Sequence, residues 1–570
     1  ARQDDDGVSF VSSLIRSSLA DTVASVAIDL QNPTATHNYI DAWIDFNQDG
    51  DWEDAGEHIL SSVDLGTTAG KKVVNFTIPQ GVQVGTTYAR FRISPDGGLA
   101  PTGMDLLGGE VEDYAVTIAA ASASQGTTVA PPAGRSAMAI AVVGGNVEVT
   151  QDGVLLQRVP ATSIGPLTLL GSAATDDLFV IDFHNGNPIP AGITIDGGLG
   201  GYDSVRVIGT GQVATYTPDA SVDGKGIIQI GSSVIHFVNL EPIDISGLSS
   251  LKVVLPGAAD IVDIRNGFDL TGAGTTPAIV ISGTTGGIGF ERIAVWNTTT
   301  LSVDTSAVEG DDRISLGDLS NAGIANFILD TRSGSDLVGL VGSIDLPGDL
   351  TLLTSADLRQ TAGTTLSVGG VTRIDAGAGE VVLDAAANDF VGAVNITAGS
   401  ATLIDANAIT LQDIRLVGNL AVTAVADITL GRIDAGSAGN LSLVSTSGSI
   451  VDDGISSTRV AGNALTLSAV TGIGTSTVAI GTAAASIDAQ VSGTGSIGID
   501  ELDGVSLVDI RAANGPITIS TGGDTVIDSV VSSTDSDAND IRILASAGHI
   551  VAGTIHAGTS AGDVTLTASS

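Results

Sequence analysis

Residues 439–444 read GNLSLV, and residues 462–467 read GNALTL. In both segments, glycine and asparagine precede leucines that alternate with small polar residues, which indicates a β-strand with one buried face. Where such segments match tightly, they recur about every 20–24 residues, which is a repeat. Related segments are GDLTLL at residue 348, GNLAVT at 418, NDIRIL at 539 and GDVTLT at 562.

A second set of segments recurs at similar spacing: ADITL at residue 426, GSIVD at 448, TGIGT at 471, GSIGI at 495 and GPITI at 515. A period of about 22 residues fits one coil of a parallel β-helix, with three short strands and three turns. A single coil cannot bury its own aliphatic side chains, so stacked coils share a core. We therefore predict a long right-handed parallel β-helix over residues 301–570, with Leu441 and Leu465 pointing inward. An antiparallel all-β array is the alternative.

The composition supports thin, repetitive β structure. Of the 570 residues, 74 are glycine and only 3% are aromatic, and no aromatic residue follows Phe390. A core of Val, Ile, Leu and Ala with many glycine turns is narrow. The chain has no cysteine, which excludes disulfides and thiolate metal sites.

The first 118 residues have a different texture. The segments VVNFTIP (73–79), YARFRIS (88–94) and GEVEDYAVTI (109–118) each alternate in the manner of strands. Strands at this spacing predict a β-sandwich over residues 1–118. Residues 119–139 are small, polar and proline-containing, which indicates a linker, and residues 140–300 indicate an irregular β-rich solenoid or capping region.

Residues 45–57 read DFNQDGDWEDAGE. Asp45, Asn47, Asp49 and Gly50 occupy positions 1, 3, 5 and 6 of a calcium loop, in which alternate side chains converge on one ion and glycine permits the bend. Asp51 supplies a further oxygen. The carboxylate of Glu57 comes one residue later than in an EF-hand.

The flanks of this loop, YIDAWI before it and HIL after it, indicate strands rather than helices. We therefore expect a Ca²⁺ loop between two strands. The alternative is an acidic hairpin of Asx turns that holds no ion.

DDGVSF, AWIDFNQDGDWEDAGE, YARFRIS and GEVEDYAVTI together resemble the GEVED domain of bacterial secreted and surface proteins. This resemblance covers residues 1–118. It implies a calcium-associated β-sandwich that serves as an accessory module of a large exported protein, without catalytic activity. The remainder resembles, more loosely, the hemagglutinin-like β-helix repeats of giant surface proteins, including those of planctomycetes.

Other charged residues suggest further contacts. Arg90 and Arg92 share one strand face, as do Glu110 and Glu112, so we expect structural ion pairs between the two strands. Asp113 is a weaker candidate for calcium. DGGLGGYDSV (196–205) is similar to a glycine-rich calcium repeat but carries one extra residue before Asp203, so it indicates a weak second calcium site or a plain solenoid turn.

The charge balance limits the classes of partner. There are 64 acidic residues against 22 basic ones, for a net charge of −42, which disfavours nucleic acid and anionic lipid. The sequence contains no run of eighteen apolar residues, so it predicts no membrane-spanning helix. The six histidines are scattered, and neither HExxH nor GxSxG occurs.

We therefore expect a non-enzymatic, extracellular or cell-surface structural or adhesive protein with Ca²⁺ as its cofactor. The alternative is a carbohydrate-active β-helix, a polysaccharide lyase or hydrolase. A groove with three or more carboxylates and an arginine would favour that alternative, whereas smooth rows of Ser, Thr and Asn would favour adhesion. The expected partners are an extracellular polysaccharide or surface ligand, and further repeats or another copy meeting the chain head-to-tail. On this view Ser570 is not a natural end.

Overall fold

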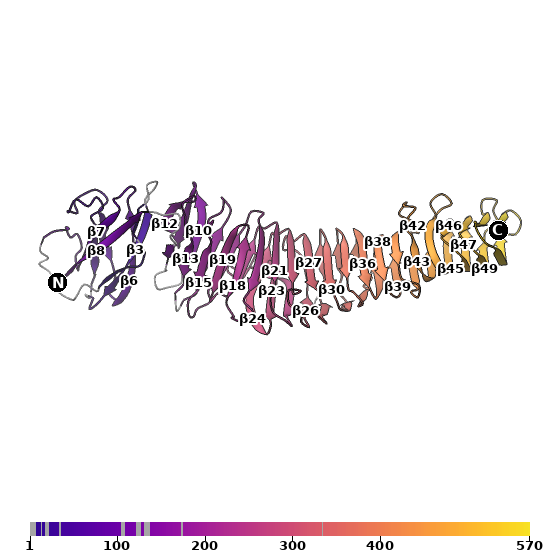
Figure 1. Cartoon of the computed structure of the whole chain (residues 1–570), viewed down its shortest axis with the longest axis horizontal. Coiled ribbons are helices and arrows are strands. Elements are labelled where there is room, and N and C mark those ends of the chain that lie inside the picture. The colour runs from indigo at the N-terminus through magenta and orange to yellow at the C-terminus, as the bar shows by residue number, and fades with distance from the viewer. Residues whose placement is uncertain are drawn as a thin grey trace. The chain divides into compact units, whose positions relative to one another are not determined.

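The fold is described by a computed structural model (Figure 1). It describes residues 7–12, 14–16, 22–33, 36–103, 109–120, 127–129, 137–172, 175–332 and 334–569. These residues contain strands and turns but no helix, and therefore none long and apolar enough to cross a membrane. The predicted all-β class is confirmed, with an N-terminal sheet domain followed by a β-solenoid of about 17 turns. Most of the expected linker and Ser570 lie outside the described residues.

The chain divides into two compact units. The first comprises Ala1–Ser249, Asp269–Thr276 and Gly289–Val295. The second comprises Ser250–Phe268, Pro277–Ile288 and Trp296–Ser570.

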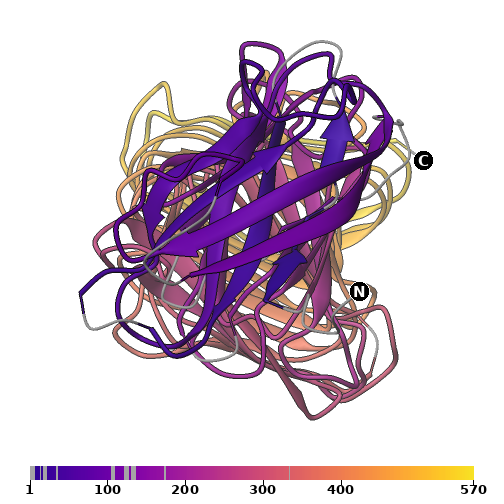
Figure 2. The same cartoon turned by 90° about the vertical axis from the view of Figure 1, so that its left-hand side faces the viewer.

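Two sheets form the N-terminal module, whose long strands lie side by side in Figure 2. One sheet has the order β1 (Val8–Phe10), β3 (Thr22–Leu30), β6 (Gly70–Ile78). The other has the order β2 (Leu14–Arg16), β8 (Glu110–Ala120), β7 (Gly85–Ser94), β4 (Tyr39–Ile44), β5 (His58–Asp64). Alternate residues of both sheets, including Val26, Phe76 and Phe91, bury into one shared core. This is the predicted sandwich.

The solenoid of the first unit mixes parallel ladders with antiparallel hairpins. β14 (Leu178–Asp182) pairs in parallel with β10 (Ala137–Val143) and with β16 (Ser204–Ile208), which pairs with β20 (Ile243–Ser246). The antiparallel strands are β11 (Asn146–Gln151) and β12 (Val154–Pro160), followed by β17 (Val213–Pro218), β18 (Gly226–Ile230) and β19 (Ser233–Val238). A shorter parallel ladder contains β9 (Thr127–Val129), β13 (Leu167–Leu170), β15 (Ile193–Asp196) and β19.

The second unit is built from long parallel ladders. One contains β21 (Ser250–Val254), β25 (Thr300–Asp304), β27 (Asn326–Thr331), β30 (Leu350–Thr354), β33 (Thr372–Asp375), β36 (Ala393–Ala398), β38 (Ile409–Leu416) and β40 (Ile428–Asp434). A second contains β22 (Ile261–Phe268), β26 (Arg313–Leu316), β28 (Leu337–Leu340), β31 (Leu358–Gln360), β34 (Glu380–Leu383), β37 (Ser400–Asp405), β39 (Leu420–Ala424), β41 (Leu441–Ser445), β43 (Val460–Ala469), β45 (Ile480–Thr494), β47 (Val505–Asn514), β49 (Thr525–Ser532) and β51 (Ile550–Ala557).

Two shorter ladders complete the coils of the second unit. From β40, a ladder continues through β42 (Ser449–Asp452), β44 (Gly472–Ile473), β46 (Ile497–Glu501), β48 (Ile517–Thr521), β50 (Ile541–Ala545) and β52 (Val564–Ala568). A separate sheet contains β29 (Ile344–Leu346), β32 (Leu366–Val368) and β35 (Asp389–Phe390), and β23 (Pro277–Thr285) forms an antiparallel hairpin with β22.

The repeated leucines stack on one another as predicted. Leu441 pairs in register with Leu420 and with Leu465. Leu441 is 2% exposed and Leu465 is 1% exposed, so both point into the core. The strand register thus turns the repeat in the sequence into a continuous aliphatic ladder.

Glycine permits close approach at the corners of the coils. A Cβ atom on Gly392 would lie 2.0 Å from the carbonyl oxygen of Gly370 on the preceding coil, and one on Gly515 would lie 2.0 Å from that of Gly495. Any side chain at these positions would push the coils apart, which explains why the repeats keep glycine there.

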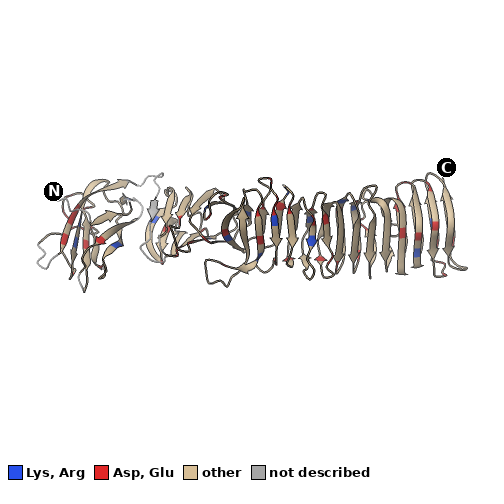
Figure 3. Ribbon diagram, turned by 90° about the horizontal axis from the view of Figure 1, so that it is seen from below, with Lys and Arg blue, Asp and Glu red and all other residues tan. Residues whose placement is uncertain are grey.

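Acidic residues outnumber basic ones along the chain (Figure 3). Several solenoid arginines pair with an aspartate two residues away on the same strand face, as Arg415 does with Asp413 at 2.8 Å. On the neighbouring coil the signs are exchanged, since Asp413 lies beside Arg432 and Arg415 beside Asp434. Such exposed pairs contribute little stability individually, but they place opposite charges side by side on adjacent strands.

Candidate functional site

The acidic loop of residues 45–57 joins β4 to β5 at an edge of the five-stranded sheet. The two flanking strands pair antiparallel, as predicted from their sequences. The N–H of Ile44 donates to the carbonyl oxygen of Glu57 at 3.0 Å, so the two ends of the loop meet. The loop is therefore held on a rigid hairpin of the sandwich.

The buried side chains of Asp45 and Glu57 lie at the base of this loop, where they accept hydrogen bonds from its backbone. Asp45 is 4% exposed and Glu57 is 2% exposed. The Asp45 carboxylate accepts hydrogen bonds from the N–H groups of Gln48 at 2.6 Å and Gly50 at 3.1 Å. Glu57 Oε1 accepts one from the N–H of Phe46 at 2.8 Å. Gly50 has a φ of 97°, a left-handed conformation that favours glycine. These bonds fix the curl of the backbone.

Three other carboxylates gather on the exposed rim of the loop. Asp49, Asp51 and Asp54 each present an oxygen atom within 4.8 Å of the others. Nδ2 of Asn47 donates to Asp49 at 3.0 Å and to Asp54 at 2.5 Å. Oxygens that share one Ca²⁺ lie about 3–5 Å apart, because each is roughly 2.4 Å from the ion. The rim therefore has the spacing of a cation site.

The structure redistributes the expected ligands. Asn47, Asp49 and Asp51 are brought together, whereas Asp45 and Glu57 lie at the base. Asp54 joins the rim but was not predicted, because it occupies position 10 of the calcium loop, which is not a ligand position of that pattern. The run DWED, with a carboxylate on either side of the tryptophan, was the available signal.

Glu57 carries an oxygen that the described residues leave unsatisfied. Its Oε2 atom is buried and makes no hydrogen bond within the described chain. Burial raises the pKa of Glu57, and the negative charge of Asp45 also raises it, while backbone hydrogen bonds oppose the shift. A buried carboxylate oxygen without a donor is costly. A hard cation would satisfy it, and the donors of the loop are the oxygens that Ca²⁺ prefers.

The arginines of the outer sheet face pair differently from the prediction. In the register of β7 and β8, Arg90 lies opposite Asp113, whereas Phe91 lies opposite Glu112. Arg90 donates from Nε and Nη2 to the two Asp113 oxygens at 2.6 and 2.5 Å. Neighbouring residues of a strand point to opposite faces, so the arginines and the glutamates lie on opposite sides of the sheet. The predicted pairing is wrong for Arg90 and Arg92 with Glu110 and Glu112.

Arg92, Glu112 and Asp113 likewise have partners other than the predicted ones. Arg92 is buried and donates to the carbonyl oxygens of Ala100 at 2.6 Å and Gly103 at 3.2 Å. Glu112 accepts hydrogen bonds from the Tyr114 hydroxyl and, at 3.2 Å, from the N–H of Gly7. Asp113, the weaker calcium candidate, has both oxygens engaged by Arg90, which supports a structural role for it.

Arg90 also connects the sheet to the acidic loop. Its Cζ atom lies 4.3 Å from the centre of the Trp52 ring, a cation–π contact. Trp52 donates from Nε1 to the carbonyl oxygen of Tyr88 at 3.4 Å. The indole therefore packs over the sheet next to the rim carboxylates.

Asp203, the weak second calcium candidate, lies in a solenoid turn just before β16. It is 3% exposed, and its Oδ1 accepts a hydrogen bond from the N–H of Asp177 at 2.7 Å. Burial raises the pKa of Asp203 to about 6, and the charges of Asp177, Asp176 and Asp196 add to the shift. Its carboxylate links one coil to the next.

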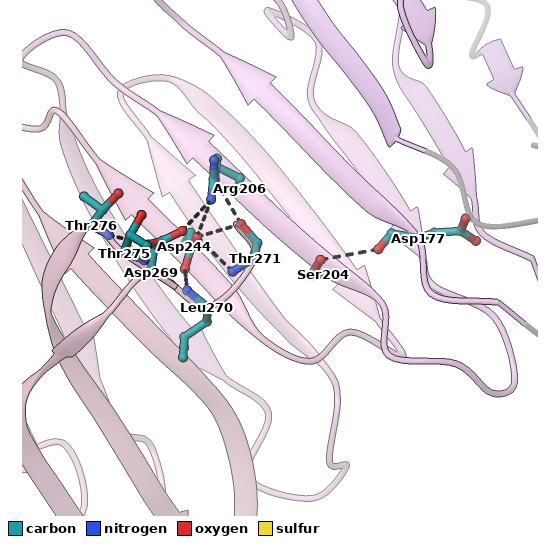
Figure 4. A network of polar contacts seen from close by, with 9 residues as sticks. All are labelled: Asp177, Ser204, Arg206, Asp244, Asp269, Leu270, Thr271, Thr275 and Thr276. Carbon is teal, nitrogen blue, oxygen red and sulfur yellow. Dashed lines mark hydrogen bonds and ion pairs between the residues drawn. The ribbon is translucent and has the colours of Figure 1, made fainter. Parts of the chain in front are cut away.

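A further charged cluster lies in the first unit, where residues 269–276 fold against the solenoid (Figure 4). Nη2 of Arg206 lies 3.0 Å from Asp244 Oδ2 and 3.4 Å from Asp269 Oδ2. The Asp244 carboxylate also accepts hydrogen bonds from the N–H groups of Leu270 at 2.9 Å and Thr271 at 3.1 Å.

Asp269 Oδ1 in turn accepts hydrogen bonds from Thr275 at 2.8 Å and Thr276 at 2.6 Å. Although burial opposes it, these bonds and the Arg206 charge lower the pKa of Asp269. Every carboxylate oxygen of the cluster thus accepts a hydrogen bond from within the fold. A pair of carboxylates also performs glycoside hydrolysis, but here Arg206, Asp244 and Asp269 hold a loop against the solenoid.

Comparison with protein families matches two parts of the chain. Residues 39–117 match the GEVED domain, and residues 325–397 match Repeats of unknown function (DUF5649). Neither the curated proteins nor the solved structures include a match to this chain. The first match spans β4, the acidic loop, β5, β6, β7 and most of β8, and the second lies within the parallel ladders. The predicted order is confirmed: the chain carries a GEVED segment followed by solenoid repeats.

Proposed function

We propose that this chain is an extracellular structural or adhesive protein of a bacterial surface, in which a calcium-stabilised GEVED module is joined to a β-solenoid. The GEVED match and the solenoid support the structural role. The observation that carries the calcium part is the buried, unsatisfied Glu57 Oε2 in a loop whose rim gathers Asp49, Asp51 and Asp54.

The outer faces of the solenoid support adhesion over catalysis. Ala421, Ser442 and Thr466 lie side by side on successive coils, pointing outward between the buried leucines. The side chains of this row are small, and those of Ser442 and Thr466 carry hydroxyl groups, so the row gives a regular surface that can form hydrogen bonds. Such a surface suits a repetitive ligand, such as an extracellular polysaccharide, or a second protein.

In the proposed module, Ca²⁺ would be held by oxygens of Asn47, Asp49, Asp51 and Asp54, with Glu57 beneath them. The ion would offset the mutual repulsion of the rim carboxylates and the burial of Glu57. The loop itself would then hold Trp52 against Arg90.

We expect the module to melt at a higher temperature in Ca²⁺ than in chelator, because ion binding stabilises only the folded loop. At a free Ca²⁺ concentration of one hundred times the dissociation constant, the gain is about 2.7 kcal/mol. The measurement is thermal unfolding of the full chain followed by tryptophan fluorescence, because Trp43 and Trp52, two of the three tryptophans, lie in this module. Asp49→Asn should remove most of the increment.

Asp96→Asn is the matched control, because Asp96 is an exposed aspartate of the same module outside the loop. It removes the same charge and should keep the Ca²⁺ response. If protein first stripped of Ca²⁺ melts at the same temperature with and without added Ca²⁺, the calcium proposal is refuted. An equal loss of response in both variants would show that Ca²⁺ merely screens net charge.

A further inference from the structure

Three buried aspartates stack at one corner of the solenoid in the second unit. Asp260, Asp312 and Asp336 each come directly before a strand, namely β22, β26 and β28, and these strands pair in parallel. The N–H of Asp260 donates to Asp312 Oδ1 at 2.8 Å, and the N–H of Asp312 donates to Asp336 Oδ1 at 3.1 Å. Their exposures are 0%, 1% and 7%. We call these three residues the aspartate column.

The second oxygens of Asp260 and Asp312 receive no hydrogen bond from the described backbone. Oδ2 of Asp260 and Oδ2 of Asp312 are buried and make no hydrogen bond within the described chain. Burial raises the pKa values of both carboxyls, and the fully buried hydroxyl groups of Thr285 and Thr305, which lie against Asp260 and Asp312, oppose that rise without cancelling it. In an all-ionised column, the unsatisfied oxygens would carry negative charge away from water, which is strongly unfavourable.

The charges that act on the column are themselves carboxylates. The negative charges of Asp336 and Asp311 add to the rise in the pKa of Asp312, and the charge of Asp312 adds to that of Asp260. Asp336 is acted on by Asp311, and its Oδ2 accepts a hydrogen bond from the Ser355 hydroxyl at 3.3 Å. Like charges about one coil spacing apart, roughly 4.8 Å, favour the protonated form.

We propose that the aspartate column retains protons in the folded solenoid, so that carboxylic O–H groups satisfy the column and the second unit tightens as the pH falls. The stack supports this, because backbone N–H groups donate to one oxygen of each residue, whereas the other oxygens of Asp260 and Asp312 are buried and accept no backbone hydrogen bond from the described residues. The first unit repeats the arrangement in Asp177 and Asp203, which are 2% and 3% exposed and joined by a 2.7 Å hydrogen bond.

The direction of the pH effect follows from the titration. Burial raises the pKa of Asp260 from 3.8 to about 6, and burial likewise raises the pKa values of Asp312 and Asp336. Between pH 3.8, the ordinary pKa of an aspartate, and about pH 6, the folded chain binds more protons than the unfolded chain. The contribution to stability is therefore complete below the unfolded pKa and is lost as the pH rises through the folded one.

The test compares Asp312→Asn with Asp427→Asn in the full chain. An asparagine amide would act in place of the retained proton, so we expect Asp312→Asn to raise the melting temperature by about 2–4 °C at roughly pH 7.5 and to flatten its rise towards about pH 5. Asp427 also comes directly before a strand of the second unit, β40, but it is exposed, and its Oδ1 accepts a 2.7 Å hydrogen bond from the N–H of Ser449. Its variant removes the same charge and should keep the wild-type pH profile.

Two results would overturn the proposal. Equal flattening in both variants would assign the pH effect to net charge. A Ca²⁺-dependent rise in melting temperature that Asp312→Asn abolishes but Asp49→Asn preserves would place a cation, rather than protons, in the column.

Infrared spectroscopy of the wild-type chain gives a second measurement, independent of whether the variant folds. A carboxylic acid C=O band should persist above the pH at which exposed aspartates ionise. Its amplitude should fall as the pH rises through the pKa of Asp260, about 6, and leave the contribution of Glu291, whose pKa burial raises to about 7. Absence of that band would contradict proton retention.

Discussion

Replacing Leu441 with aspartate is expected to cost the second unit more than about 4 kcal/mol of unfolding free energy. Leu441 is 2% exposed and lies between Leu420 and Leu465 on the two adjoining coils. An aspartate there would place an unpaired carboxylate in an aliphatic ladder, where no water or donor reaches it. Because each coil supports its neighbours, the damage should spread to the coils on both sides.

Thermal unfolding followed by circular dichroism measures this effect, and Ser442→Asp is the matched control. Ser442 is the next residue on the same strand and points outward, beside Ala421 and Thr466. The control should unfold close to the wild-type temperature. Equal tolerance of the two aspartates would mean that the strand register is wrong by one residue.

Arg206→Met is expected to destabilise the first unit by about 3–5 kcal/mol, because it removes the cation that pairs with a fully buried carboxylate. The Asp244 side chain is 0% exposed, and Arg206 is the cation that lies 3.0 Å from it. Backbone N–H groups would remain as donors, but the charge of Asp244 would lose its counterion. The melting temperature should fall, and residues 269–276 should become more accessible to proteolysis.

Arg265→Met is the control for this prediction. The Arg265 side chain is 60% exposed and pairs with Asp263 at the surface, so its loss should cost less than about 1 kcal/mol. Adding Asp244→Asn to Arg206→Met should recover part of the loss by removing the stranded charge. A loss from Arg206→Met no larger than that from Arg265→Met would show that the cluster does not hold the loop.

The sequence was informative wherever local pattern and repeat coincide. GNLSLV and GNALTL pair in register in the structure, as their aligned sequences predict. In a parallel solenoid, residues one repeat apart lie directly beside each other on adjacent coils. The strands around the acidic loop were also predictable, since YIDAWI and HIL are β-rich on both sides of a glycine turn.

Contacts that depend on register or on long-range folding could not be predicted in the same way. The period of two in a strand shows that Arg90 and Arg92 share a face, but only the pairing of β7 with β8 decides that this face meets Asp113 rather than Glu112. Asp244 and Asp269 meet Arg206 because residues 269–276 fold back over a coil, and no periodicity marks that return.

The in-register pairing of β39, β41 and β43 also has a mechanical consequence. The hydrogen bonds between these strands run along the stacking direction, so tension applied in that direction would load them one row at a time. A coil of about 22 residues that peels away would release roughly 70 Å of extended chain in place of about 4.8 Å of stacked height. The second unit would therefore extend one coil at a time under tension, and each coil that unfolds would dissipate part of the applied work.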